Sequence, residues 1–137
     1  MALEFEAFVP AMSFATEWQQ WLARAEREVA SVLRSLPPAL RDEAQAVTVS
    51  YERKPAPELI KEGIEEDTLG LFVGSAFPEG LHSAPFPQQI ILYLENIQEA
   101  AENDPEIFDE EVRATFLHEL AHYLGLDEDD LIDRGLD

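Results

Sequence analysis

Apolar residues recur every three or four positions between residues 13 and 35, a spacing that places them on one face of a helix. The pattern stops at Pro37 and Pro38, because proline lacks the amide donor of a helix and disfavours helical geometry in the residue before it. We therefore predict a long amphipathic helix over residues 13–35, in which the two tryptophans are core anchors rather than ligand contacts. Its apolar positions are Phe14, Trp18, Trp21, Leu22, Ala25, Val29, Val32, Leu33 and Leu36.

Three short segments have the residue content typical of strands. Residues 47–52 alternate between apolar and polar side chains, residues 69–73 form a short apolar run, and residues 89–94 are rich in β-branched and aromatic residues. Residues 75–88, between the second and third segments, contain several prolines and predict a long loop. Loops of this length often border functional sites, although a solvated connector explains this one equally well.

Two more helices are predicted after the third strand. The first is short and covers residues 96–102. The second begins at Asp104-Pro105-Glu106, which provides a capping side chain, a proline at the first helical position and an acid near the positive end of the helix dipole. It runs to about Leu124. The whole pattern predicts an α+β domain, in which a sheet of three or more short strands packs on the long N-terminal helix and on this C-terminal helix.

The length of 137 residues suits one domain, so we predict a single domain over residues 1–137. The apolar fraction of 46% argues for a folded chain despite a formal charge of -20. This charge would repel nucleic acids and anionic membranes, and it favours cations and basic peptides or proteins as partners. An acidic surface that only maintains solubility accounts for the charge equally well.

The chain contains no cysteine, which excludes disulfides, thiolate metal sites and cysteine nucleophiles. Any bound metal would therefore depend on histidine, aspartate and glutamate. The first ten residues are acidic and lack the basic start and apolar run of a secretory signal, and no segment has the length and hydropathy of a membrane span. These features predict a cytoplasmic protein.

Candidate chemistry is concentrated in the sequence His118-Glu119-Leu120-Ala121-His122, which lies inside the last predicted helix. Residues four apart project from the same helical face about one turn apart, so both imidazoles can reach one ion. Zinc suits such a pair, because a catalytic zinc needs only three protein ligands and an open position for water. Glu119 flanks that position, where it could act as the general base on a zinc-bound water. Two hydrogen-bonded histidines without a metal are the alternative interpretation.

The third ligand is left open by the residues alone. Gly125 can adopt left-handed geometry and turn the chain back toward the helix, and it is followed by a short acidic tail. A ligand upstream of the motif is also compatible with the pattern. His82, in the proline-containing loop, is either a surface residue or a neighbour of the cleft. Thr115 and Glu111 share the face of the two histidines and could orient a ligand. The downstream candidates are Asp127, Glu128, Asp129, Asp130 and Asp133.

Residues 118–128 resemble the extended zincin signature, in which a glycine and then a third ligand follow the HExxH motif at fixed spacing. This resemblance puts Glu128 at the position of the third ligand. More closely, the chain resembles the minimal zincin-like family of small bacterial proteins, described as zinc metallopeptidases. The segments that match this family in order are residues 36–40, 69–72 and 115–119.

The resemblance implies an α+β fold with a small sheet on two helices, zinc as the cofactor, and peptide hydrolysis with Glu119 as general base. It also implies that a peptide substrate lies extended along a strand near the site, without indicating which strand. Two departures from larger zincins are visible. Met1 and Met12 are the only methionines, so no Met-turn follows the motif, and we expect no C-terminal subdomain to wall the cleft. A shallow, open site is expected.

Three functions are compatible with these observations. The first is a zinc-dependent peptidase. The second is a metal-stabilised binding or regulatory module with little or no catalytic activity, which the short chain and acidic surface favour. The third is an acidic interaction protein without a metal, which depends on the charge alone. Only the first two require His118 and His122 to bind an ion.

Overall fold

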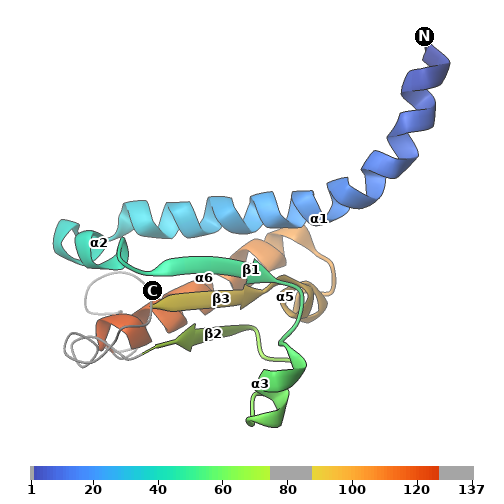
Figure 1. Ribbon diagram of the computed structural model, residues 1–137. Helices are drawn as coiled ribbons and strands as arrows, with labels where there is room; N and C mark the ends of the chain where they lie inside the picture. The colour runs from blue at the N-terminus through green and yellow to red at the C-terminus, as the bar shows by residue number, and fades with distance from the viewer. Residues whose placement is uncertain (1, 75–87, 127–137) are drawn as a thin grey trace.

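The structure is a computed structural model, and it describes residues 2–74 and 88–126, with side chains from Glu17 onward within those ranges. It contains helices and one three-stranded sheet, so the predicted α+β class is confirmed. Figure 1 shows the sheet alongside two long helices, α1 and α6. The elements are α1 Ala2–Ser35, α2 Pro38–Ala44, β1 Thr48–Glu52, α3 Pro57–Lys61, β2 Gly70–Val73, β3 Gln89–Tyr93, α5 Leu94–Ala100 and α6 Pro105–Leu124.

Helix α1 begins well before the predicted start at residue 13 and ends at Ser35 as expected. Its N-terminal part extends away from the rest of the molecule (Figure 1). Within the described ranges, no helix is both long enough and apolar enough to cross a bilayer.

Two short helices, α2 and α3, were not predicted. Each has proline at its first position, Pro38 in α2 and Pro57 in α3. Proline is well accepted there, because the first amide of a helix has no acceptor and the fixed backbone angle of proline is already helical. The proline pair that stops the pattern of α1 therefore also begins α2.

The sheet has the strand order β1-β3-β2, with β1 parallel and β2 antiparallel to the central strand. Val49 and Phe72 flank Ile90, while Tyr51 and Gly70 flank Leu92. Since residues directly opposite one another point to the same face, these positions define the face that packs on the helices. The polar side chain of Gln89 lies on the other face and donates a hydrogen bond to Ser50.

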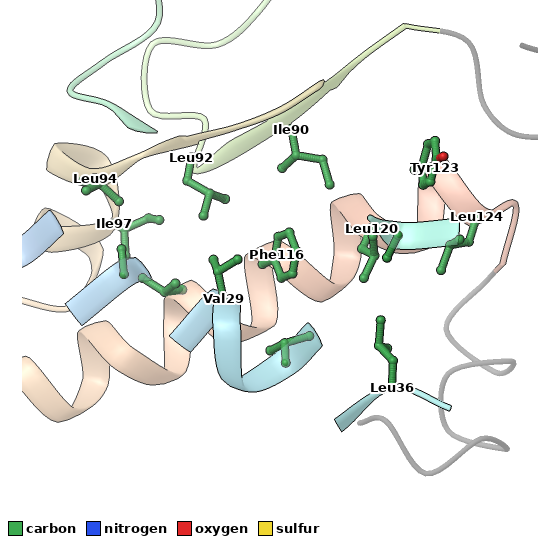
Figure 2. Packing of buried hydrophobic residues seen from close by; sticks show 14 of the residues in the cluster. Val29, Leu36, Ile90, Leu92, Leu94, Ile97, Phe116, Leu120, Tyr123 and Leu124 are labelled. Atoms are coloured by element: carbon green, nitrogen blue, oxygen red, sulfur yellow. The ribbon is translucent and has the colours of Figure 1, made fainter. Parts of the chain in front are cut away.

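The hydrophobic core lies between this face of the sheet and the two long helices. Phe116 of α6 is fully buried and lies between Val29 of α1 and Ile90 and Leu92 of β3 (Figure 2). Leu36, just past the end of α1, closes the core toward the C-terminal part of α6. Burial of a side chain of this size stabilises the fold by about 1.5–3 kcal/mol, so the core determines how α6 is rotated about its axis.

Two ion pairs join α1 to α6 outside the core. Arg24 makes a bidentate pair with Asp109, with N–O distances of 3.0 and 2.8 Å, and Arg113 pairs with Glu28 at 2.8 Å. The planar guanidinium of arginine suits such paired geometry, which fixes the relative orientation of the two helices.

Both ends of α6 have the predicted caps. The side chain of Asp104 accepts hydrogen bonds from the amides of Glu106 and Ile107, and Pro105 occupies the first turn. Gly125 ends the helix with a φ of 72°. These caps set the length of α6, and thereby the position of the motif near its C-terminal end.

The three tyrosines of the chain should titrate above their ordinary range. Burial and the nearby Glu26 raise the pKa of Tyr51 to about 12, and burial raises the pKa of Tyr93 and of Tyr123. Because the folded state favours the neutral phenol, the resulting stability is complete below pH 10 and is lost as the pH rises toward 12. We expect the absorbance change of tyrosine ionisation to begin above pH 10 in the native protein and to centre near 10 in urea.

The variant Tyr51→Phe provides the control for this titration. It should remove the uppermost ionisation and reduce the loss of stability between pH 10 and 12. A native titration centred at pH 10 would contradict the burial of these phenols.

Candidate metal centre

Helix α6 places the two motif histidines on its solvent side. Phe116 and Leu120 are buried in the core, whereas His118 and His122 are exposed. Since residues four apart lie one turn apart on the same face, burial of the first pair directs the second pair outward. The position of both imidazoles thus follows from the packing of the helix.

Tyr123 anchors the last turn of α6, next to His122. Its hydroxyl donates a hydrogen bond of 3.1 Å to the carbonyl of Glu43, near the C-terminal end of α2. Its ring contacts Phe72 of β2 edge-on, with ring centroids 5.9 Å apart. The turn that carries His122 is therefore held from two sides.

The imidazoles of His118 and His122 are close enough to share one ion. Their Nε2 atoms lie 3.3 Å apart, and their rings meet edge-on with centroids 4.8 Å apart. Two nitrogens bound to a tetrahedral zinc at about 2.0–2.1 Å would be separated by roughly 3.3–3.4 Å. The separation of the two nitrogens therefore suits a shared zinc ion. One imidazole can also donate a hydrogen bond to the other at this distance, depending on the tautomer.

Glu119 lies on the side of α6 that faces β2, where the strand and the helix approach closely at Gly70. A Cβ atom on Gly70 would stand 2.6 Å from Cγ2 of Thr115 and 3.4 Å from Cγ of Glu119. Non-bonded carbons normally stay about 3.5–4.0 Å apart. Only glycine thus allows β2 to lie against this part of the helix.

Gly70 is a residue of the site that the sequence analysis missed. Its position in a predicted strand carries no sign of chemistry, although glycine inside a strand pattern often marks a close approach of the backbone to another element. Thr115, proposed from its spacing, is buried against Gly70 and so shares the surroundings of Glu119. Glu111 is half-buried one turn before Thr115.

The third ligand is not found in the part of the chain that the structure describes. Among the side chains described, those of residues 17–74 and 88–126, no group of three histidines, aspartates or glutamates could hold a metal ion. Glu128 and the other tail candidates, Asp127, Asp129, Asp130 and Asp133, lie outside the described residues, as does His82. Glu128 therefore stays a prediction.

The structure is a small α+β domain with the HExxH sequence on a helix beside its sheet. The resemblance to zincins predicted this arrangement. Comparison with known families agrees: residues 44–136 match the family described as zincin-like metallopeptidase. The match covers more than half of the chain, which therefore belongs to this family. A comparison with curated proteins gave no match.

The close approach at Gly70 makes a specific prediction for the variant Gly70→Ala. The φ angle of Gly70 is not positive, so alanine is conformationally acceptable and would, without the contact, stabilise the strand by about 0.4–1 kcal/mol. Overlap with Thr115 should instead lower the free energy of unfolding by about 1–3 kcal/mol, measured by urea denaturation.

Thr115→Ser removes the methyl group that would collide with the new Cβ. In the Thr115→Ser variant, Gly70→Ala should lower the free energy of unfolding by about 1 kcal/mol less than it does in the wild type. If the losses in the free energy of unfolding caused by Gly70→Ala and Thr115→Ser simply add in the double variant, the contact with Thr115 is not what destabilises Gly70→Ala.

Proposed function

We propose that this protein is a zinc-dependent peptidase in which His118 and His122 bind the metal and Glu119 is the general base. The observation that carries the proposal is the 3.3 Å separation of the two Nε2 atoms, which suits a shared zinc ion. Membership of the zincin-like metallopeptidase family supports the same chemistry. We propose Glu128 as the third ligand, on the basis of its position after Gly125.

The substrate would be a peptide segment bound along β2. This strand is at an edge of the sheet, and among the described strands it pairs only with β3. An extended peptide can add to such an edge through backbone hydrogen bonds. Because Gly70 of β2 lies next to Glu119, a peptide on this strand would pass close to the general base. The acidic surface favours basic peptides.

In this mechanism each residue has a distinct task. Zinc, when bound, supplies Lewis acidity that polarises the scissile carbonyl. Glu119 takes the proton of the attacking water and later returns it to the leaving amine. The anchored turn at Tyr123 keeps His122 in place, and the lack of a side chain at Gly70 lets β2 lie close to Thr115 and Glu119.

Zinc loading and the variant Glu119→Gln test the proposal together. We expect the wild type to bind about one equivalent of zinc, with a higher Tm in the zinc-loaded form, and to cleave members of a peptide library. Glu119→Gln should retain zinc and lose about 10²–10⁴-fold in kcat, because the amide cannot accept the proton. Metal content and peptide products are measured on the same samples.

Glu110→Gln, an exposed change on the same helix, controls for the loss of charge and should leave the kcat unchanged. His118→Ala and His122→Ala should each abolish stoichiometric zinc binding. If the protein binds zinc but shows no cleavage that depends on Glu119, the result would instead support the metal-stabilised binding module. If the protein binds no transition metal, the remaining candidate function is that of an acidic interaction protein without a metal.

Substitutions in the acidic tail test the third ligand. Glu128→Gln should weaken zinc affinity on the order of 100-fold, measured by competition with a chelating dye. Asp127→Asn, Asp130→Asn and Asp133→Asn change the same charge and should have much smaller effects. If one of these three weakens zinc affinity most, that residue replaces Glu128 in the assignment.

A further inference from the structure

A hollow of about 550 Å³ lies between α1, the end of β1 and α5. Its walls include Trp18 and Trp21, which also pack against the core as expected of anchors. The ring of Trp21 is held against Phe108 of α6, with centroids 4.6 Å apart. Phe108 precedes His118 by ten positions, or about 15 Å along the helix, so the hollow is separate from the proposed metal centre.

One guanidinium group of the protein already occupies part of this hollow. The Cζ atom of Arg53 lies 4.5 Å from the ring centroid of Trp18, and its Nη1 atom is 2.9 Å from a carboxylate oxygen of Glu95. Stacking on an aromatic face with a carboxylate alongside is the arrangement by which proteins bind arginine side chains. The Arg53 side chain is 61% exposed, so it can leave this position without opening the core.

The remaining charge of the hollow is negative. Glu17 and Glu99 line it in addition to Glu95, whereas Arg53 is the only cation among its lining residues. Lys54 approaches Glu99 only to 3.4 Å, and that carboxylate is 70% exposed. When Arg53 moves aside, the hollow presents an indole face bordered by three carboxylates, a surface complementary to a cation.

We infer that this hollow binds an arginine side chain of a basic partner peptide, whose guanidinium takes the position of Arg53 over Trp18. The formal charge of -20 attracts such peptides to the protein, and the hollow selects the arginine. Arg53 competes with the partner, because its own guanidinium occupies the same aromatic face and the same carboxylate.

Tryptophan emission gives a direct measurement, since Trp18 and Trp21 are the only tryptophans of the chain and both line the hollow. The probe is a short end-blocked peptide with two arginines among glycines, titrated into the 137-residue chain at physiological ionic strength. A saturable change in emission is expected. The same peptide with citrulline, which is neutral and nearly isosteric, should cause none. No saturable change with the arginine peptide would overturn the inference.

Matched variants separate the hollow from general charge attraction. The double variant Glu17→Gln and Glu99→Gln should weaken binding about fivefold. The pair Glu65→Gln and Glu66→Gln, exposed and outside the lining of the hollow, changes the same charge and should alter affinity less than about twofold. Equal weakening by both pairs would show diffuse attraction and overturn the inference.

Removal of the resident cation tests the competition. Arg53→Gln should bind the arginine peptide about threefold more tightly, because it frees Trp18 and Glu95. Circular dichroism and thermal melting establish that each variant is folded. Weaker binding by Arg53→Gln would mean that Arg53 is part of the structure of the hollow, and it would overturn the proposed exchange.

Discussion

The burial of one side of α6 is the constraint on which the rest of the structure depends. This 20-residue helix contacts α1, α2, α5, β2 and β3, and its apolar side chains form much of the core. Burial of these side chains stabilises the fold by several kcal/mol in total. This is far more than the free energy that the exposed imidazoles could gain from any particular orientation of the helix. The core therefore determines the direction in which His118 and His122 project from the helix.

Electrostatic interactions have a different role in a chain with 29 acidic and 9 basic residues. The four ion pairs within the described ranges each join elements that are distant in the sequence. Such pairs contribute little to stability at the surface, roughly 0–1 kcal/mol each, but the two between α1 and α6 fix how these helices are oriented. With several cations engaged in this way, most carboxylates are left facing solvent, where they form the negative field of the protein.

The features predicted best from the sequence are those with a strong local cause. The capping residues at the two ends of α6 give its position, and therefore the placement of the motif. The short helix α2 was missed because its initial proline also marks the end of the preceding helix, and α3, with five residues, is too short to show a helical pattern. The contact at Gly70 and the hollow at Trp18 join residues far apart in the chain, and no local pattern specifies which strand or helix will meet them.

The absence of a side chain at Gly70 also has a consequence for folding specificity. Gly70 lies opposite Leu92 in the antiparallel pairing of β2 with β3. A slip of one residue would turn Leu69 or Leu71 toward α6, and a slip of two would bring Thr68 or Phe72 there. Each of these side chains would collide with Thr115 and hold the strand off the helix. The contact with α6 thus disfavours slipped registers of β2, and the missing side chain beside Glu119 helps to select the native pairing with β3.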